Sequence, residues 1–531
     1  MSRTRRCVLL VLLCALLGGV PSVTIAPDRA AAAGTYGAPT PTGQVALTWA
    51  PTYMSDNHYY TQAEAEAVAR RFDLVAAMPI AFQKYVGRMR TVNPDVVLMS
   101  YANATLAQPR DVASLPESAF AHDQYGRRIT ANGFGTNLME SSSAAWRRTA
   151  LQQCDARVAQ SGFDGCLLDM LTLGIFAKGF VTGLPVKPGT STPYTQAEYR
   201  DQMASLARAY RVDSPGLIHV GNAVENSYRY WRASVQSRPL ARSMPATQME
   251  DFLRGAKSGV NAYPSAADWL HNVDVVRDLE SAGVTGLFTT KLWVGATAAE
   301  AAAWDSYAMA SFLMGANGRS YFAFTRSRDK AGASGTNLPY QMPRQIGLPT
   351  GAMYQTGSGA YLRRFAHGVS VVNPGSTWVS VDLGGTYRTL DGRTLSKLSL
   401  APHSGDVLVS SSYNGTPTVD TTPPSGTHGW KNVAPWRLQV GGSATDDVAV
   451  ASAQVAVRSE TTHAWLRRDG SWGSYQLLPA SLAQTGVRST TWSKTLSLPP
   501  GRYGVALVVN DTAGNANRTP RPWVVATVPA A

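Results

Sequence analysis

Cysteine and histidine are scarce in this sequence. Of 531 residues only four are cysteine and eight are histidine, and Cys7 and Cys14 fall in a segment that we expect to be removed. Only Cys154 and Cys166 remain, which excludes a disulfide scaffold and a thiolate metal site. Whether these two pair with each other stays open. Metal-ligand His/Cys spacing, a phosphate-binding glycine loop and a nucleotide fingerprint are also missing, so we expect no metal or organic cofactor.

Long apolar runs and clusters of basic residues are missing too. After the first 33 residues no segment approaches the ~20 apolar residues that span a bilayer, so we expect no membrane span in the mature protein. The net charge is +13, but there is no Lys/Arg run or RNA-binding signature, and nucleic acid is not expected as a partner. The positive balance suits a cell-wall or other anionic surface polymer. The alternative is an arginine-rich genome with no charged ligand.

Residues 1–33 have the pattern of a cleaved export signal. Three arginines precede the apolar run Val8–Leu17, and the segment ends with the small residues Ala30–Ala33. A membrane anchor is the alternative, but the run is shorter than a bilayer span requires. The sequence therefore predicts a secreted, extracellular protein.

Eight short apolar runs alternate with segments of helical period between residues 44 and 345. The runs are nearly continuously hydrophobic, as expected for strands covered on both faces. Repeated strand–helix units predict a parallel sheet of the α/β class, and eight of them favour a closed (β/α)8 TIM barrel. The runs are Val45–Met54, Phe72–Ile80, Val96–Leu106, Phe163–Leu173, Gly216–Ala223, Met244–Asp251, Val284–Trp293 and Ser320–Arg326.

Helix signals lie in the gaps between these runs. Three pairs have the hydroxyl-x-x-carboxylate spacing of a capping box, in which both side chains bond backbone N–H groups at a helix start. The segment 144–160 places five apolar residues on one side of a helix, which should pack on the barrel. The boxes are Thr61 with Glu64, Thr195 with Glu198 and Thr297 with Glu300, and the apolar stripe is Trp146, Ala150, Leu151, Cys154 and Val158.

The pattern changes after the eighth run. Residues 350–411 hold short β-type runs with glycines between them, which predicts a small antiparallel β-sandwich domain. Residues 412–425, with Asn414-Gly415 and Pro423-Pro424, are typical of a linker. Residues 426–531 alternate apolar and polar residues between turns, which predicts an immunoglobulin-like β-sandwich.

Carboxylates close several of the barrel runs. Functional residues of such barrels project from the C-terminal ends of strands, and Asp169 ends the fourth run. The period of two points Leu167 and Asp169 inward and Cys166 toward the helices. On the sixth run we prefer Glu250 to its neighbour Asp251, because adjacent strand residues face opposite sides and Glu reaches further.

Further polar and aromatic residues follow the other strands. Glu225 follows the fifth run, as either a site residue or a loop charge. Aromatic faces stack on sugar rings, amide and basic groups bond sugar hydroxyls, and Lys291 could keep a nearby carboxylate ionised. Two carboxylates at one mouth are what glycosidic cleavage needs. The expected substrate-binding residues are Tyr53, Asp56, Tyr101, Asn103, Asn222, Glu225, Lys291, Trp293 and Arg326.

Three motifs resemble a hypothetical glycosyl hydrolase family of bacterial barrels, the one numbered fifteen. They are Ser100-Tyr101-Ala102-Asn103-Ala104, the segment from Phe120 to Arg127, and Gly162-Phe163-Asp164-Gly165 followed by Asp169. The family is similar to the α-galactosidase and polygalactosaminidase barrels. The resemblance implies Asp169 as nucleophile or base and Glu250 as acid/base. The C-terminal region resembles bacterial immunoglobulin-like modules, which act as spacers or weak carbohydrate binders.

The leading hypothesis is a secreted glycoside hydrolase that cleaves a polysaccharide or oligosaccharide with retention, using Asp169 and Glu250. A carbohydrate polymer is the expected partner. The alternative is a non-catalytic polysaccharide-binding or cell-surface protein with a degenerate barrel. A secreted esterase or deacetylase is a weaker alternative, because the sequence contains no Gly-x-Ser-x-Gly elbow and no histidine pair at metal spacing.

Overall fold

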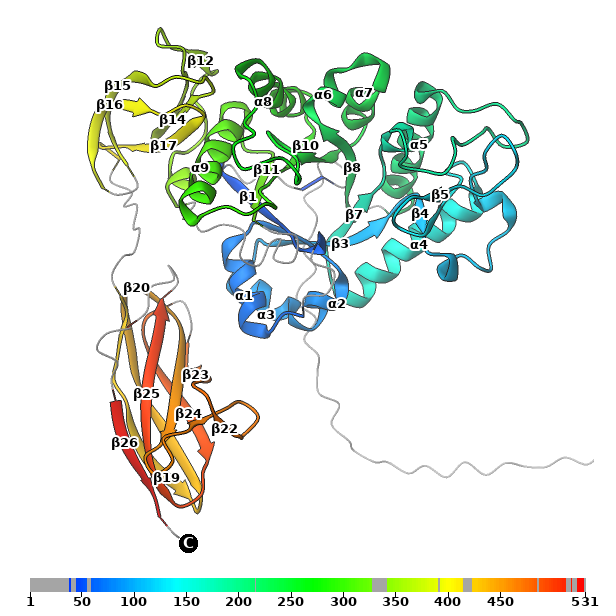
Figure 1. Cartoon of the computed structure of the whole chain (residues 1–531). Helices are drawn as coiled ribbons and strands as arrows, with labels where there is room; N and C mark the ends of the chain where they lie inside the picture. The colour runs from blue at the N-terminus through cyan, green and yellow to red at the C-terminus, as the bar shows by residue number, and fades with distance from the viewer. Residues whose placement is uncertain are drawn as a thin grey trace, which may run out of the picture.

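The computed structural model describes residues 38–39, 44–54, 59–214, 216–326, 341–389, 392–413, 423–484, 487–511, 517 and 523–529. The export signal, Asp56 and most of the expected linker lie outside these ranges. Within them, the chain forms a barrel followed by two groups of antiparallel strands (Figure 1).

Each of the eight apolar runs overlaps one strand of a closed, parallel barrel, and the strand in the fifth run extends beyond it to Asn226. The strands close in the order β1-β11-β10-β9-β8-β7-β3-β2, which confirms the expected fold class. The strands are β1 (Leu47–Pro51), β2 (Leu74–Ala77), β3 (Val97–Asn103), β7 (Gly165–Asp169), β8 (Ile218–Asn226), β9 (Ala246–Asp251), β10 (Thr285–Lys291) and β11 (Tyr321–Thr325).

Side chains of alternate strand residues fill the barrel interior. Leu167 lies in the cluster that includes Leu47, Trp49 and Met99, whereas Cys166 and Leu168 pack outward with the helices. Close strand contact explains one motif glycine: a Cβ on Gly165 would lie 1.9 Å from the Ile218 carbonyl oxygen. The period-of-two prediction for this strand is therefore correct.

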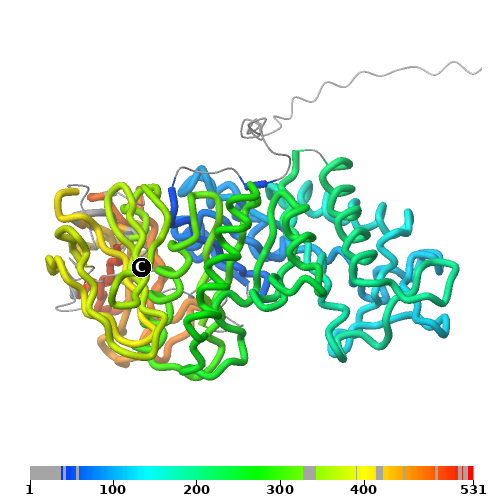
Figure 2. Tube along the Cα trace, turned by 90° about the horizontal axis from the view of Figure 1, so that it is seen from above, coloured from blue at the N-terminus to red at the C-terminus, as the bar shows by residue number. Residues whose placement is uncertain are grey.

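Helices surround the barrel strands (Figure 1), and Figure 2 shows the same chain turned by 90°. All three expected capping boxes form, at the starts of α1, α5 and α9. The helices are α1 (Gln62–Arg71), α2 (Pro79–Phe82), α3 (Val86–Val92), α4 (Ala144–Ser161), α5 (Gln196–Asp213), α6 (Ser227–Trp231), α7 (Ser237–Arg242), α8 (Ala266–Ser281), α9 (Ala298–Gly315) and α10 (Gln341–Gln345), with 3-10 turns at Thr52–Met54, Gln83–Tyr85, Pro109–Asp111, Glu117–Ala119, Gly174–Phe176 and Ala233–Val235.

The two mature cysteines form a disulfide. Cys154 on α4 bonds Cys166 on β7, and both are fully buried. The five residues of the predicted apolar stripe on α4 are all buried. Helix and strand are thus joined covalently as well as by packing.

Two long connections form a lobe beside the barrel. The β3–α4 connection contains a three-stranded sheet of β4 (Leu106–Ala107), β5 (Thr130–Ala131) and β6 (Thr136–Leu138). It pairs with the β7–α5 connection, since the N–H groups of Asn132 and Thr182 donate to the carbonyls of Phe180 and Thr130. Both connections leave the C-terminal ends of barrel strands.

A six-stranded antiparallel sheet packs against the outer side of α9. Arg363 donates to the carbonyls of Leu313 and Ala316 at the end of that helix, at 2.8 and 2.7 Å. In the order β12-β13-β14-β17-β15-β16, the strands are Tyr354–Gln355, Tyr361–Phe365, Gly368–Asn373, Ser404–Ser410, Val379–Arg388 and Thr394–Leu400.

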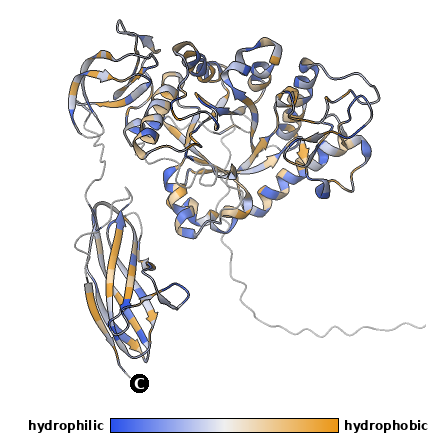
Figure 3. Ribbon diagram, viewed as in Figure 1, coloured by the Kyte–Doolittle hydropathy of each residue, from blue (hydrophilic) through white to orange (hydrophobic). Residues whose placement is uncertain are grey.

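The C-terminal strands form a separate antiparallel sheet with its own core. Apolar and polar residues alternate along these strands (Figure 3), and the apolar ones form one buried cluster. The immunoglobulin-like assignment stays a prediction. The strands are β18 (Ser425–Gly426), β19 (Gly429–Ala434), β20 (Arg437–Ser459), β21 (Trp465–Leu466), β22 (Trp472–Gly473), β23 (Leu478–Leu482), β24 (Val487–Ser497), β25 (Gly501–Asp511) and β26 (Trp523–Val528).

Among the described residues, no helix has the length and apolar character needed to cross a bilayer.

Candidate active site

Five neighbouring strands of the barrel bring polar side chains to one mouth. Asp169 ends β7, Glu250 lies at the end of β9, and Lys291 ends β10. Between β7 and β9, the register of β8 shifts after Asn222, a bulge that redirects the strand at the mouth. Tyr101 lies near the end of β3.

One amide joins the two carboxylates. The Nδ2 atom of Asn222 donates to Asp169 Oδ1 at 2.9 Å and to Glu250 Oε1 at 2.6 Å. An amide nitrogen carries two hydrogens, so it can serve both acceptors at once. These two oxygens therefore lie at most about 5.5 Å apart. The carboxyl groups of retaining glycosidases are about 5 to 5.5 Å apart, and those of inverting ones are further apart.

Lys291 is the counter-ion of Glu250. Its Nζ lies 2.8 Å from Glu250 Oε2, and only 7% of the Lys291 side chain is exposed. Burial alone would raise the pKa of the Glu250 carboxyl, but the charge of Lys291 and hydrogen bonds from Lys291 and Asn222 lower it below its usual value. Glu250 is therefore ionised at neutral pH.

Asp251 also reaches the mouth. Its Oδ1 lies 3.3 Å from Lys291 Nζ, so the expectation that only one of these two neighbours faces the site is wrong. The strand ends here and Leu253 takes a left-handed backbone conformation, with φ 64°, so the alternation of a regular strand no longer holds. Burial and the charge of Glu250 raise the pKa of Asp251, although Lys291 opposes them.

Among the described residues, Asp169 is bonded by neutral donors and forms no ion pair. Its Oδ2 accepts from the Tyr101 hydroxyl at 2.6 Å, and its Oδ1 accepts from the Met170 N–H at 2.8 Å. Burial, and then the charge of Glu250, raise the pKa of the Asp169 carboxyl despite these donors. Met170 has φ 61°, and such strain in a residue without glycine's freedom collects at functional sites.

A pair of tyrosines forms the floor beside Asp169. The rings of Tyr53 and Tyr101 stack with centroids 4.9 Å apart. Gln248 on β9 holds the Tyr53 hydroxyl, with Nε2 donating at 2.9 Å. Sequence reasoning missed Gln248, although its place two residues before Glu250 puts it on the same face of the strand.

The other predicted site residues are less central. Trp293 donates from Nε1 to Thr325 Oγ1 at 2.9 Å, and Arg326 follows β11 partly exposed. The Asn103 amide oxygen accepts from the Leu106 N–H at 2.7 Å, so it shapes the turn after β3. Glu225 lies in β8, beyond the end of its apolar run, where it pairs with Arg229 at 2.5 Å and accepts from Thr172.

The described residues hold no cluster of three or more His, Cys, Asp or Glu side chains placed to bind a metal. What the mouth does hold is one carboxylate kept ionised, one with a raised pKa, and an amide between them. Such a pair can donate a proton on one side of a bond and attack or activate water on the other.

A parallel eight-stranded barrel with two carboxylates at its mouth is an arrangement that glycoside hydrolases use. The chain belongs to hypothetical glycosyl hydrolase family 15, whose model matches residues 90–369. No curated protein matches the sequence.

Several solved structures are similar in outline. One is a noncanonic maltogenic α-amylase from Thermotoga neapolitana, 12% identical, with 70% of this chain and 100% of that chain covered and a TM-score of 0.44. Another is a pullulanase complexed with maltotetraose from Anoxybacillus sp. LM18-11, 10% identical, with 69% and 71% covered and a TM-score of 0.43. At these TM-scores the likeness carries no argument about substrate or mechanism.

Proposed function

We propose that this glycoside hydrolase cleaves a polysaccharide or oligosaccharide with retention of anomeric configuration, using Asp169 and Glu250. The observation that carries the proposal is the Asn222 amide, which bonds both carboxylates and keeps their nearest oxygens within about 5.5 Å of each other. That gap leaves too little room for a water molecule to attack from the far side of the sugar.

The charges favour the opposite roles from those that the family resemblance implies. Glu250, held ionised by Lys291, is suited to attack the anomeric carbon. Asp169, whose pKa is raised, is suited to protonate the leaving oxygen. A carboxylate beside a buried ammonium is a poor proton donor, because the positive charge lowers its pKa and favours the ionised form.

Cleavage takes place in two steps, through a covalent ester between Glu250 and the sugar. Glu250 forms a bond to the anomeric carbon while the glycosidic bond breaks and Asp169 gives its proton to the departing oxygen. The ester removes the charge of Glu250 and with it one cause of the raised pKa of Asp169, which then acts as base. Asp169 takes a proton from water, the water oxygen bonds the anomeric carbon, and Glu250 leaves as a carboxylate.

Asp251 keeps Lys291 paired during the reaction. While Glu250 is esterified it carries no charge, yet Lys291 remains buried and charged. Asp251 Oδ1, 3.3 Å away, then supplies the anion that a buried cation requires.

The test is reducing-end release from a panel of α-linked, amino-sugar and cell-wall polysaccharides. Wild type is compared with Asp169→Asn, Glu250→Gln and the exposed control Asp111→Asn at equal folded concentration. We expect release by wild type and the control and its loss in both site variants. For a cleaved substrate, the first anomer seen by NMR should retain the configuration. If no protein released reducing ends and all four still bound the polysaccharide, the result would favour the alternative of a non-catalytic polysaccharide-binding protein.

Export belongs to the same proposal. The Arg-rich start and the apolar run of residues 1–33 support it, as does the Cys154–Cys166 disulfide, because disulfides persist in oxidising compartments. N-terminal sequencing of protein recovered from the medium of an expressing bacterium should begin near Gly34. Retention of Met1 in a cell-associated protein would count against export.

A further inference from the structure

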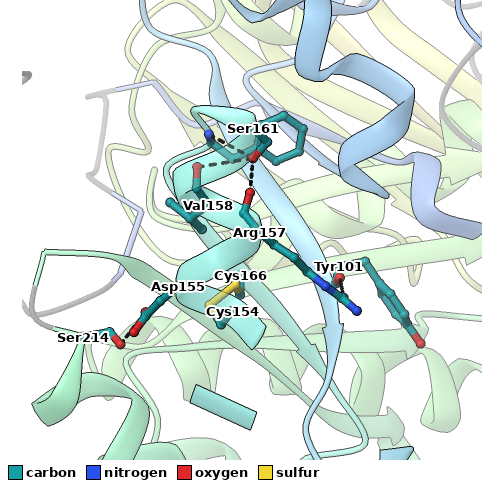
Figure 4. Close-up of a disulfide and its surroundings, with 9 residues drawn as sticks. Tyr101, Cys154, Asp155, Arg157, Val158, Ser161, Cys166 and Ser214 are labelled. Carbon is teal, nitrogen blue, oxygen red and sulfur yellow. Dashed lines mark hydrogen bonds between the residues drawn. A yellow bond between two sulfur atoms is a disulfide. The ribbon is translucent and has the colours of Figure 1, made fainter. Parts of the chain in front are cut away.

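Helix α4 is tied to both strands that carry the Tyr101–Asp169 pair. The disulfide joins Cys154 of the helix to Cys166 of β7, three residues before Asp169. One turn further along α4, the Arg157 guanidinium donates to the backbone carbonyl of Tyr101 on β3. Figure 4 shows the two ties side by side, with Arg157 extending from the helix to Tyr101.

These ties close a ring of contacts. From α4 the ring runs through the disulfide to β7 and Asp169, then through the 2.6 Å hydrogen bond to the Tyr101 hydroxyl, and back through the Tyr101 carbonyl to Arg157. The strands themselves pair in register, with Tyr101 opposite Leu167. The distance from the phenol to the carboxylate therefore depends on how β3 and β7 sit on this one helix.

A third contact fixes the direction of the helix. Trp146, one of the first residues of α4, is fully buried and donates from Nε1 to the Ala104 carbonyl just beyond β3, at 2.9 Å. The helix is thus held at the mouth by Trp146 and further down by Arg157 and the disulfide. A helix held at both ends resists sliding along β3.

We propose that Arg157 and the Cys154–Cys166 disulfide are positioning groups for Asp169, so that the proton donor is aligned only in the oxidised protein. The inference rests on the proposed function for the role of Asp169. The disulfide itself forms when the two thiols lose two electrons and two protons to a disulfide oxidant such as oxidised glutathione, which becomes two thiols. The bond then acts on the site only through β7.

The first measurement is hydrogen exchange on the full chain, which needs no substrate. Arg157→Met and the double variant Cys154→Ala/Cys166→Ala are compared with wild type and with Arg148→Met, an exposed arginine on the same helix. We expect exchange at least about threefold faster in peptides over 100–104 and 166–170, with the β10 peptide unchanged. Equal exchange in all four proteins would overturn the proposal.

The second measurement is kinetic, on a substrate found by the reducing-end assay. Arg157→Met should lower kcat about tenfold with little change in KM, because misplacing a proton donor affects the transition state more than binding. Arg157→Lys should restore part of the loss, and Arg148→Met should match wild type. An equal loss in Arg148→Met, or a change in KM alone, would contradict a positioning role.

The two measurements separate the two proposals. Wild type could fail to cleave any polymer while exchange at both strand ends rises in the Arg157 and cysteine variants. That result would support the positioning role of Arg157 and the disulfide and would contradict the proposed hydrolysis. Wild type could instead cleave a polymer while neither variant alters exchange or kcat. That result would support hydrolysis and contradict the positioning role of Arg157 and the disulfide. Circular dichroism and thermal unfolding confirm that each variant is folded before either comparison.

Discussion

Lys291 decides which of the two carboxylates is charged. It is buried and lies within 3.3 Å of both Glu250 and Asp251. With this cation in place, Glu250 has a lowered pKa although it is surrounded by acidic neighbours. The difference between the two carboxylates therefore comes from one side chain on the next strand.

Replacing Lys291 with Met should move the acid limb of the pH–rate profile to higher pH. Without the ammonium, burial raises the pKa of Glu250 unopposed, and more alkaline solution is needed to ionise it. We expect kcat/KM at pH 5 to fall about tenfold or more relative to its value at pH 7. Lys397→Met, an exposed lysine of the six-stranded sheet, is the control. An unshifted acid limb would show that Glu250 does not need Lys291.

Asp169→Asn should make the protein more stable while it abolishes activity. The pKa of Asp169 is raised in the folded state, so its ionisation opposes folding. This penalty is absent below the unfolded pKa of about 3.9 and complete above the folded pKa. We expect Tm to rise by about 2 °C or more at pH 7, with the gain shrinking toward pH 4. A loss of stability at pH 7 would assign Asp169 a structural role.

The sequence predicts most of the residues that meet at the mouth but not their contacts. Asp169, Glu250, Asn222 and Lys291 are recognisable because each closes an apolar run. The bridging role of Asn222 depends on a bulge in β8 and on strands that are distant in sequence, and no periodicity reports either. Asp251 could not be placed, since the rule of alternation fails where a strand ends.

Among the elements, β7 is preceded by a segment in which each residue has a structural role. Its Gly-Phe-Asp-Gly start combines four local needs. Gly162 ends α4 in a left-handed conformation, with φ 70°, and Phe163 is buried. The Asp164 carboxylate accepts from Arg90 and from the Leu98 N–H, each at 2.8 Å. The motif that signals the family is thus a structural one, and it places Asp169 five residues beyond Asp164.

Gly165→Ala should destabilise the barrel by about 3 kcal/mol. The added methyl group would lie 1.9 Å from the Ile218 carbonyl oxygen, and backbone cannot move aside as a flexible side chain can. Gly87→Ala is the matched control, because nothing lies within 4 Å of a Cβ there and alanine suits a helix. Urea unfolding of both variants measures the difference. Equal midpoints would mean that β7 and β8 are further apart than described.

Element ends were harder to predict than element types. The apolar run 72–80 predicts a single strand, whereas β2 ends at Ala77 and Pro79 begins α2. Proline lacks an N–H group and favours the first turn of a helix, which explains the break. The small sheet of β4, β5 and β6 was not foreseen, because its strands have only two or three residues each.

In the whole molecule, α9 lies between the barrel and the six-stranded sheet and is part of one apolar cluster with both. It is buried along most of its length, with the barrel on one side and strands β14 and β17 on the other. The C-terminal sheet has a separate apolar cluster, in which the described residues all belong to strands or the turns between them. The two antiparallel regions therefore relate to the barrel in different ways.

Truncations should separate these two regions. A chain that ends at Tyr413 should keep the Tm of the barrel within about 2 °C, because it loses only an independent core. A chain that ends at Pro349 should aggregate or unfold, because the apolar outer face of α9 would be exposed to water. Thermal unfolding and light scattering test both. Normal stability of the shorter chain would show that α9 needs no cover.

The hydrogen bonds at the mouth have a final consequence for ligand recognition. Every oxygen of the Asp169 and Glu250 carboxylates already accepts from a protein donor. Asp169 Oδ1 accepts from Asn222 and Met170, and Asp169 Oδ2 accepts from Tyr101. Glu250 Oε1 accepts from Asn222, and Glu250 Oε2 accepts from Lys291. A sugar hydroxyl therefore bonds an oxygen that already has a partner, either through its remaining lone pair or by replacing that partner. Measured affinity reports only the surplus over these internal bonds. Turnover, rather than binding strength, is thus the measurement by which the natural polymer should be recognised.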